Sequence, residues 1–453
     1  MRNDLFRKVQ QFSFENIDDY STGSLVTRLT NDVQQVQNVL MMGLRMALRA
    51  PGMFLGALIM AFMMNRQLAV IILIVIPLLL AAILLILKTA FPRFGEMQRK
   101  LDRLNSGIQE SLTNVRVVKS FVREDHEIEK FSKLNDDLKE SSLRALRIVI
   151  ATMPVMMFAM NVTTLAVVWY GGNIIIAGKM PVGDLTAFTT YIVQILMSLM
   201  MLSMVFVMIT MSLASARRIS EVLNEKSDLD NPENPDFSIP DGSITFDHVY
   251  FNYKKGAGEP VLSDINLSIQ SGETIGIIGG TGSAKTSLVN LISRLYDVTD
   301  GSVKVGGKDV RSYDMETLRN EVAVVLQKNV LFSGTILDNL RWGDKNASEE
   351  ECKRVCRLAC ADEFIDRMPE GYNTYIEQGG SNVSGGQKQR LCIARALLKK
   401  PKVLILDDST SAVDTATDAK IRKAFLTEIP ETTKLIIAQR ISSVQDADRI
   451  IVM

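Results

Sequence analysis

The fold of this chain is decided by nine residues, Gly279-Gly280-Thr281-Gly282-Ser283-Ala284-Lys285-Thr286-Ser287. They follow an apolar run, 274–278, that reads as a buried strand, and they precede a run, 288–292, whose apolar spacing suits a helix. A strand, a glycine loop and a helix in this order form a cradle for phosphate, because backbone N–H groups and the helix dipole face the anion. In such a cradle Lys285 would reach the terminal phosphates and the Thr286 hydroxyl would bind Mg²⁺.

One residue of this cradle departs from the usual pattern, because Ala284 precedes the lysine where a glycine is common. A Cβ is tolerable at this position if the residue is already helical, and we expect the cradle to form with the alanine in place. On this stretch alone, an ordinary glycine-rich turn remains the alternative.

Length and composition indicate a multidomain protein without a bulk nucleic-acid partner. The 453 residues correspond, as a soft prior, to two or three domains. The formal net charge is zero, so no excess of basic residues points to nucleic acid. The hydrophobic content of 47% is uneven, because the long uncharged runs lie in the first half of the chain.

The four cysteines predict neither a disulfide framework nor a metal site. So few cysteines in a long chain favour a reducing compartment. Cys352, Cys356 and Cys360 recur every four residues on one side of an expected helix, with no fourth ligand near them. We therefore expect these three side chains to form a small apolar core face.

Four segments of the first half are long and apolar enough to cross a membrane as helices. They lie at roughly 39–65, 67–90, 147–172 and 182–212. The first of them requires Arg45 and Arg49 to face a cavity or the membrane interface.

Basic residues set the expected orientation of these segments. The connections at 65–67 and 179–181 carry one basic residue each, whereas 88–147 carries many, and Arg217 and Arg218 follow the last segment. The positive-inside rule therefore places 88–147 and everything after 217 in the cytoplasm. We expect a multi-pass protein of the cell (plasma) membrane.

The basic segment is itself helical by pattern, since apolar residues recur at helical spacing at Leu104, Ile108, Leu112, Val115, Val118 and Val122. Long helices that project from a membrane need a partner, which a second cytoplasmic domain could supply.

Methionines form a stripe along the last apolar segment, at Met197, Met201, Met204, Met208 and Met211. One interpretation is a soft, adaptable lining for apolar ligands. The other, which we favour, is packing against neighbouring helices or lipid.

A polar, proline-broken linker at 226–242 separates a first domain, 1–225, from a soluble domain, 243–453. In this second domain Tyr253 precedes the glycine loop, and its ring could stack on a nucleotide base. Gln327 follows an apolar run, 322–326, and its amide oxygen could meet Mg²⁺ or an attacking water.

A second anion-binding helix start follows, with the sequence Ser384-Gly385-Gly386-Gln387. The buried run 403–406 then delivers two carboxylates to its end. Asp407 suits a Mg²⁺ ligand, and Asp408 stands where a base that activates water would stand. A last strand, 435–438, delivers Gln439.

Taken together, these residues resemble the nucleotide-binding domain of ATP-binding cassette (ABC) transporters. The resemblance covers the whole chain, and it implies an α-helical transmembrane domain followed by an α/β phosphate-loop nucleotide-binding domain with a helical signature subdomain. Exporters of this family carry six membrane helices. The chain therefore resembles a half-transporter trimmed at both ends, without the first two helices and the last part of the cassette.

The resemblance also implies roles in the binding of ATP and Mg²⁺. Tyr253 would stack on the base, and 279–287 would hold the phosphates. Mg²⁺ would be held by Thr286, Gln327 and Asp407, and Gln327 would in addition sense the γ-phosphate.

Other segments are implied to act between domains or subunits. The signature Ser384–Gln387 would contact ATP held by the other cassette of a head-to-tail dimer, and Asp414 would belong to the D-loop. Asp18–Gly23 and Val115–Phe121 match the coupling helices of the family.

Two positions depart from the family pattern. The catalytic glutamate is replaced by Asp408 and the switch histidine by Gln439. An aspartate is one methylene shorter, and misplacement of a catalytic group by about 1 Å can cost on the order of 10²-fold in rate. Gln439 can donate a hydrogen bond to the γ-phosphate but cannot titrate near pH 7. ATP binding is expected to survive at this site while hydrolysis is weak.

The resemblance therefore implies ATP-dependent export of an apolar or amphipathic substrate, as one half of a heterodimer similar to multidrug exporters with a degenerate ATP site. The partner would be a second half-transporter, whose active site this chain's signature completes. Small molecules, lipids and peptides remain open as substrates. The alternatives are a homodimeric exporter with slow hydrolysis and a non-transporting, ATP-gated regulatory membrane protein.

Overall fold

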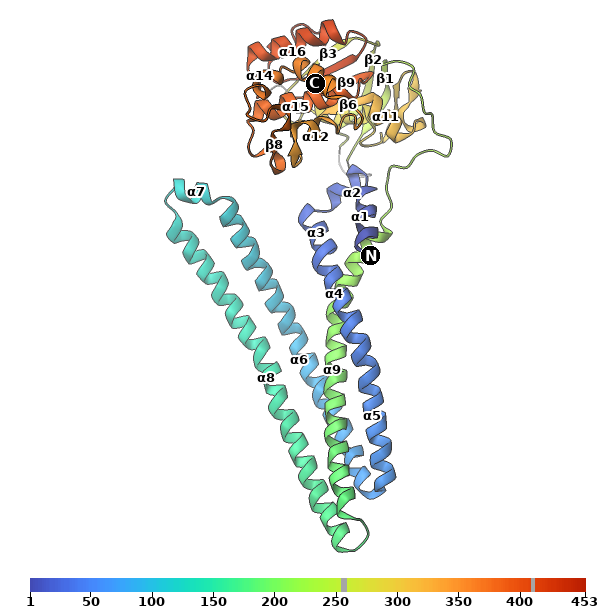
Figure 1. The fold of residues 1–453 in the computed structure, drawn as a ribbon, viewed down its shortest axis with the longest axis vertical. Helices are drawn as coiled ribbons and strands as arrows, with labels where there is room; N and C mark the ends of the chain where they lie inside the picture. The colour runs from blue at the N-terminus through green and yellow to red at the C-terminus, as the bar shows by residue number, and fades with distance from the viewer. Residues whose placement is uncertain (254–258, 409–411) are drawn as a thin grey trace. The chain divides into compact units, whose positions relative to one another are not determined.

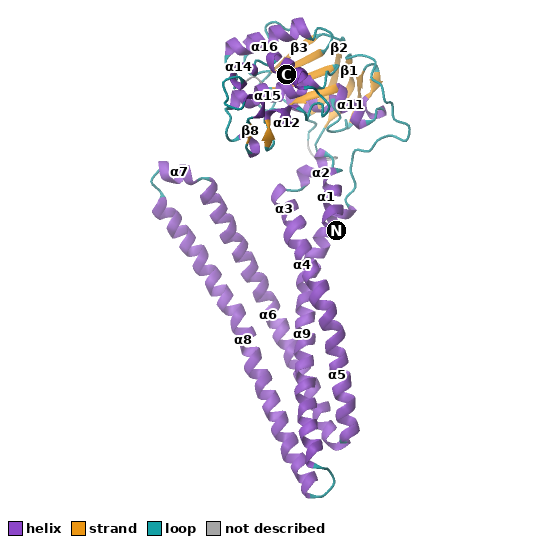
Figure 2. Cartoon of the chain, viewed as in Figure 1, coloured by secondary structure: helices purple, strands orange, loops and turns teal. Residues whose placement is uncertain are grey.

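The computed structural model describes residues 1–253, 259–408 and 412–453. They form two compact units, Met1–Leu5 with Val26–Leu223 and Phe6–Leu25 with Asn224–Met453. The first unit is helical, and the described strands all belong to the second (Figure 2). The fold class expected from the sequence, a helical domain followed by an α/β domain, is confirmed.

The first unit consists mainly of four long helices. Two short helices, α1 (Arg2–Gln10) and α3 (Thr22–Thr27), cross the division between the units. The other helices are η1 (Arg28–Asp32), α4 (Val33–Asn38), η2 (Val39–Gly43), α5 (Leu44–Met64), α6 (Arg66–Thr113), α7 (Val115–Ser120), α8 (Glu124–Ile176) and α9 (Val182–Asn224).

Four helices of the described chain are long and apolar enough to cross a membrane. By length and composition the candidate spans are Thr22–Met64, Arg66–Thr113, Met157–Ile176 and Val182–Val205. The turn between the first two is fixed locally, because the Asn65 side chain caps α6 by accepting hydrogen bonds from the backbone N–H groups of Gln67 and Leu68.

Two of these helices are much longer than a membrane crossing requires. α6 has 48 residues and α8 has 53, whereas about 20 residues cross the hydrocarbon core. They lie side by side as a hairpin with α7 at its tip (Figure 1). Acidic residues in the first turn of α8, Glu124, Asp125 and Glu127, suit the positive end of the helix dipole.

The core of the first unit is apolar, and ion pairs join the end of α9 to η1. Small residues of α5, Ala57 and Ala61, let α6 approach, and Phe188 and Ile192 of α9 complete the core. Arg218 near the end of α9 donates two hydrogen bonds to the buried carboxylate of Asp32, at 2.8 and 2.5 Å. This bidentate pair fixes the end of α9 against η1.

A five-stranded parallel sheet organises the second unit. Its strands, in spatial order, are β11 (Arg449–Val452), β3 (Thr274–Ile278), β10 (Thr433–Ile437), β9 (Val403–Asp407) and β6 (Val322–Val325). An antiparallel sheet lies beside it, in the order β2 (Leu262–Ile269), β1 (Ile244–Phe251), β4 (Asp300–Val305) and β5 (Lys308–Asp309).

Both faces of the parallel sheet are buried at β3, β10, β9 and β6, which explains why these four strands read as apolar runs, whereas the edge strand β11 is largely exposed. In β9, Val403 and Ile405 belong to one apolar cluster, whereas Leu404 and Leu406 belong to another. The second cluster includes Cys352, Cys356 and Cys360, which are free and buried, so the predicted core face is confirmed.

Short helices complete the second unit. They are α2 (Phe14–Asp19), α10 (Lys285–Ile292), η3 (Val310–Ser312), α11 (Met315–Glu321), α12 (Ile336–Leu340), α13 (Glu349–Leu358), α14 (Asp362–Ile365), η4 (Gly371–Asn373), η5 (Gln378–Gly380), α15 (Gly385–Leu398), α16 (Thr415–Glu428) and η6 (Ile441–Ser443). A small hairpin joins β7 (Gly334–Thr335) and β8 (Tyr375–Ile376).

The polar segment expected to be a linker, 226–242, is packed on the second unit. Leu229 and Ile239 are buried in it. Asp236 forms a β-bridge with Tyr313, and the Asn231 side chain donates a hydrogen bond to Asp314 at 2.6 Å. The segment is therefore held to the second unit by buried apolar side chains and hydrogen bonds.

Candidate functional site

The parallel sheet brings the predicted site residues to one edge. In neighbouring order, β3 leads into the glycine loop, β10 leads to Gln439, β9 ends at Asp407 and β6 is followed by Gln327. The strands are parallel, so their carboxyl ends meet at the same edge, where ligands of open α/β sheets bind.

The glycine loop runs from β3 to the start of α10. Glycine is required at Gly279, since an added Cβ would lie 2.5 Å from the Met453 carbonyl oxygen and 2.7 Å from Ser283 Oγ. Gly282 has a φ of +84°, a left-handed conformation that favours glycine. The loop therefore closes tightly ahead of the α10 N-terminus, as a phosphate cradle requires.

The condition under which a Cβ was expected to be tolerable, a helical Ala284, is not met. The φ and ψ of Ala284 are 63° and 20°, which is left-handed, and helical geometry starts only at Lys285. The usual glycine at this position is thus explained by backbone conformation, because left-handed geometry costs an L-residue roughly 1–2 kcal/mol. Packing of the Ala284 side chain against the apolar core offsets part of this cost.

We therefore predict that Ala284→Val destabilises the start of α10 far more than the same substitution would at a helical position. A left-handed β-branched residue costs of order 1–3 kcal/mol, whereas valine at a helical position costs at most about 0.7 kcal/mol relative to alanine. Hydrogen-exchange protection of residues 285–289 measures the loss. Ala284→Gly should change the protection of residues 285–289 little. Ala419→Val, at an exposed helical position of α16, is the matched control, and it measures the effect of ordinary helix propensity on the protection of its own helix. Equal effects at 284 and 419 would contradict the left-handed geometry.

Lys285 and Thr286 occupy the positions expected of phosphate and metal ligands. Lys285 Nζ donates hydrogen bonds to the carbonyl oxygens of Gly279 at 2.9 Å and Gly280 at 2.7 Å. Its ammonium is therefore held over the loop. Thr286 Oγ1 donates a hydrogen bond to Asp407 Oδ2 at 2.8 Å, which places a hydroxyl and a carboxylate at one point.

These donors fit Mg²⁺. Burial raises the pKa of Asp407, and the neighbouring Asp408 charge adds to the effect, so a cation would relieve the cost of this buried carboxylate. Among the described residues no cluster of three His, Cys, Asp or Glu side chains could hold a metal alone. Mg²⁺ characteristically uses one or two protein oxygens and completes its shell with water and phosphate.

The Asp408 carboxylate forms hydrogen bonds with Gln439 and Gln327, the two glutamines that the sequence predicts for this site. Gln439 Nε2 donates a hydrogen bond to Asp408 Oδ2 at 2.9 Å, and Gln327 also hydrogen-bonds this carboxylate. Burial raises the pKa of Asp408, while these two hydrogen bonds oppose the shift. The structure thus places Gln327 with Asp408, and it places Thr286 with the adjacent Asp407.

The signature starts α15 with a reciprocal cap. Ser384 Oγ accepts a hydrogen bond from the Gln387 N–H, and Gln387 Oε1 accepts one from the Ser384 N–H at 2.8 Å. A Cβ on Gly386 would lie 2.8 Å from the Ala412 carbonyl oxygen, so glycine allows a close approach there. The spacing of serine and glutamine is a capping-box signal that the sequence analysis did not use.

Tyr253 lies beside the start of α10. Its hydroxyl is 2.8 Å from Ser287 Oγ, and its ring meets the edges of Phe251 and Tyr296. The side chain remains 38% exposed, so part of the ring is accessible to a ligand.

Asp414, which is predicted to belong to the D-loop, is exposed and caps α16, where its carboxylate accepts a hydrogen bond from the Thr417 N–H at 3.0 Å. The preceding residues 409–411 lie outside the described part of the chain. Gln389 of the signature helix reaches the same segment, because its Oε1 accepts a hydrogen bond from the Ala412 N–H at 3.0 Å.

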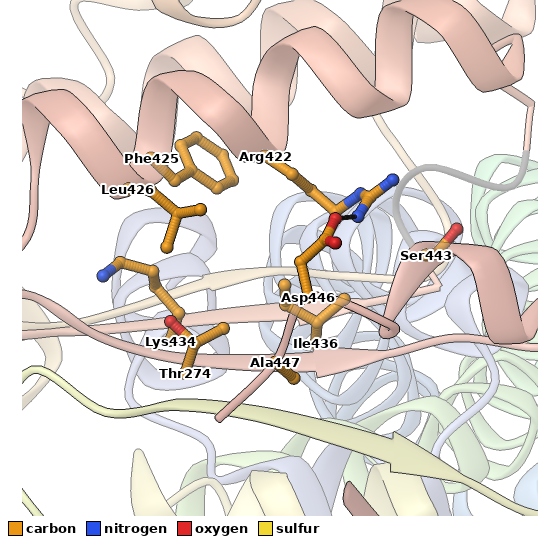
Figure 3. A pocket seen from close by; sticks show the side chains of 9 residues that line it. All are labelled: Thr274, Arg422, Phe425, Leu426, Lys434, Ile436, Ser443, Asp446 and Ala447. Atoms are coloured by element: carbon orange, nitrogen blue, oxygen red, sulfur yellow. Dashed lines mark hydrogen bonds and ion pairs between the residues drawn. The ribbon is translucent and has the colours of Figure 1, made fainter. Parts of the chain in front are cut away.

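A small cavity under α16 is separate from these groups. Figure 3 shows Arg422, Phe425 and Leu426 of α16 facing Thr274, Lys434 and Ile436 of the sheet. Arg422 pairs with Asp446, and this pair ties the segment after Gln439 to α16. The cavity is lined by none of the predicted site residues.

Sequence reasoning missed the aromatic and polar groups around Tyr253, above all Tyr296 and α2. Tyr296 Oη donates a hydrogen bond to Asp18 Oδ2 at 2.7 Å, although 278 residues separate them in sequence. The only sequence signal was the density of aromatic residues at 250–253 and 296.

A phosphate loop at the carboxyl edge of a parallel sheet, in a chain whose described residues include four candidate membrane spans, indicates a membrane-bound phosphate-loop nucleotide-binding protein. Residues 1–200 match the family described as ABC transporter transmembrane region, and residues 262–411 match the family described as ABC transporter. The chain belongs to the ABC transporter family, and it has the architecture of an exporter half-transporter. Its second unit is therefore an ABC ATPase domain, the class that binds ATP and couples its hydrolysis to transport.

Relatives and a solved structure agree with this assignment. The whole chain is 40% identical to the uncharacterized ABC transporter ATP-binding protein YfiB of Bacillus subtilis and spans 78% of it. It is 34% identical to the fatty acid ABC transporter ATP-binding/permease protein of Mycobacterium bovis and spans 71% of that protein. The fold is similar to the structure of a bacterial Atm1-family ABC exporter with ATP bound, with a TM-score of 0.84 at 24% identity, over 100% of this chain and 79% of that one.

Proposed function

We propose that this chain is the subunit of a heterodimeric exporter that binds ATP at a weakly hydrolytic site. The observation that carries the proposal is the pairing of Asp408 with Gln439 at 2.9 Å, where the family uses a glutamate and a histidine. A carboxylate that is one methylene short and already bonded to two amides is poorly placed to take a proton from water.

In this proposal the site keeps the groups that bind ATP and Mg²⁺. The α10 N-terminus, the loop amides and Lys285 hold the phosphates, and Tyr253 stacks on the base. Mg²⁺ bound at Thr286 and Asp407, with Gln327 as the third predicted ligand, would neutralise charge between the β- and γ-phosphates. Gln439 donates a hydrogen bond toward the γ-phosphate without exchanging a proton near pH 7.

Hydrolysis is proposed to occur in the partner's site, which this chain completes. Ser384 and the first N–H groups of α15 form a helix N-terminus suited to an anion, and Gly386 keeps it close to the D-loop segment. The signature would contact ATP bound by the partner cassette, and Asp414 would lie at the same interface.

An exposed helix and an apolar cleft support the dimer. Phe121 and Val122, which directly follow α7, are 72% and 81% exposed. On the cassette, Val330, Phe332 and Trp342 line a cleft, and the last two rings stack at 4.0 Å. We propose that the α7 segment of the partner subunit occupies this cleft beside Gln327, which would join its membrane helices to this ATP site.

The transported substrate is proposed to be apolar or amphipathic. Met197 and Met204 of the methionine stripe are exposed on α9, and adaptable thioethers suit such ligands. The fatty acid transporter among the relatives agrees with this class of substrate. We place the protein in the plasma membrane with its cassette in the cytoplasm.

Vanadate trapping tests which subunit hydrolyses ATP. The intact heterodimer is incubated with Mg²⁺, vanadate and a photoreactive azido-ATP, which becomes trapped as the diphosphate only where turnover occurs. The two subunits are then separated on a gel. We expect most of the trapped label on the partner, whereas labelling without vanadate at low temperature should mark both subunits.

The alternatives give different patterns. A chain that purifies without a second half-transporter and traps label itself would indicate the homodimeric exporter. Trapping in a complex that moves no amphiphile across vesicles would favour the regulatory protein. Preferential trapping on this chain within a heterodimer would contradict the proposal.

A further inference from the structure

Helix α2 is docked on the cassette beside the base-binding ring. Tyr296, which follows α10, is the residue between them. Its hydroxyl donates a hydrogen bond to Asp18 Oδ2 at 2.7 Å, and its ring lies 6.1 Å from the Phe14 ring between centroids. On the other side its ring contacts Tyr253 edge-on, with centroids 5.1 Å apart.

Tyr253 is in turn attached to the phosphate-binding helix. Its hydroxyl is within 2.8 Å of Ser287 Oγ, in the first turn of α10. The Phe251 ring packs against both tyrosine rings, with its centroid 4.8 Å from that of Tyr253 and 5.8 Å from that of Tyr296. A continuous set of contacts therefore runs from Asp18 to the start of α10.

The hydrogen bond between Tyr296 and Asp18 of α2 is expected to persist over the physiological pH range. Burial raises the pKa of Tyr296, and the hydrogen bond to Asp18 raises it further, so the phenol remains a donor throughout the physiological range. α2 is also held at the chain segment that follows α9. The Asn16 side chain donates to the Lys226 carbonyl oxygen at 3.1 Å, and the Tyr20 hydroxyl donates to Glu225 Oε2 at 3.1 Å.

We propose that Tyr296 is a positioning residue that ties the orientation of Tyr253 to the docking of α2, so that base binding and α2 docking strengthen each other. The inference rests on the proposed role of Tyr253 in base stacking. Coupling between two binding events is reciprocal, and it typically amounts to about 5–150-fold.

Two measurements on the intact transporter test the proposal. The first is hydrogen-exchange protection of residues 14–19 with and without MgATP. The second is base discrimination, the ratio of the concentrations of inorganic tripolyphosphate and ATP that displace azido-ATP from this subunit. In the unaltered protein, MgATP should raise the protection of α2 by about fivefold or more.

Tyr296→Phe keeps the ring against Tyr253 and removes the hydrogen bond to Asp18. It should abolish the ATP-dependent protection of α2 and leave base discrimination nearly intact. Asp18→Ala should have the same effect, and the double variant should add nothing, because both changes remove one interaction. Tyr296→Leu should in addition lower base discrimination, since Tyr253 loses its support.

Tyr313→Phe is the matched control. Tyr313 is fully buried in the same cassette, and its hydroxyl donates to the Val305 carbonyl oxygen at 2.8 Å. This change should lower protection across the cassette equally with and without ATP. ATP-dependent protection of α2 that survives in Tyr296→Phe and Asp18→Ala would overturn the inference.

Tyr253→Ala separates this inference from the proposed function. If Tyr253→Ala lowers base discrimination but the Tyr296 variants alter neither measurement, the stacking role stands and the link to α2 is refuted. If Tyr253→Ala leaves base discrimination unchanged, the stacking role fails and this inference fails with it.

Discussion

Lys285→Ala is expected to weaken MgATP binding at this site by about 10- to 100-fold, because charge-assisted hydrogen bonds contribute roughly 1.5–3 kcal/mol and 1.4 kcal/mol is tenfold. The loss of affinity is limited because the Lys285 ammonium already forms hydrogen bonds within the protein. The ammonium binds the carbonyl oxygens of Gly279 and Gly280 and Ser283 Oγ, and it exchanges some of these contacts for phosphate. Displacement of photoreactive ATP from this subunit by MgATP measures the change.

Two controls separate ligand binding from folding. Lys345→Ala removes an exposed lysine elsewhere in the cassette and should leave the affinity unchanged. Lys285→Ala itself should preserve the hydrogen-exchange protection of β3, since that strand is buried independently of the lysine. An affinity that is unaltered in Lys285→Ala would contradict the assignment of 279–287 as the phosphate loop.

The parallel sheet was predictable because its signals are local. The runs at 274–278, 322–326, 403–406 and 435–438 each form a strand buried on both faces, and such strands are apolar throughout. The glycine loop that follows the first run and the polar residues that follow the other three then fall at the common carboxyl edge. The grouping of Gln327, Asp408 and Gln439 therefore follows from the fold class.

The backbone conformation of single residues and the contacts between distant segments could not be predicted from the sequence. Nothing in the identity of Ala284 shows that it is left-handed, since alanine is the strongest helix former. Likewise the contact of Asp18 with Tyr296 joins segments 278 residues apart, and a polar N-terminal segment alone reads as solvated. The order of the 226–242 segment depends in the same way on partners such as Tyr313 and Asp314.

Ser384→Arg is expected to abolish most ATP turnover of the intact heterodimer, whereas Asp408→Asn should change it by less than about twofold. Removal of one preorganised donor at a site of developing charge costs about 10²–10³ in rate, and an arginine also places a cation at the positive end of α15. Asparagine at 408 can still accept the Gln439 hydrogen bond and tolerates the positive φ of 48° found there. It removes only a base that the proposal already treats as misplaced.

Ser348→Arg is the control for the loss of a helix cap. Ser348 caps α13 through the same reciprocal arrangement, with Glu351 in the role of Gln387, and it is exposed in the same way. Both serine changes should cost about 1 kcal/mol of stability through the lost cap, but only Ser384→Arg should stop turnover.

Asp408→Glu should raise hydrolysis at this site only in part, because Gln439 still stands in place of a histidine. Steady-state ATPase of each purified variant decides the matter. If Asp408→Asn silences the heterodimer while Ser384→Arg is harmless, this chain holds the working site and the asymmetric function is wrong.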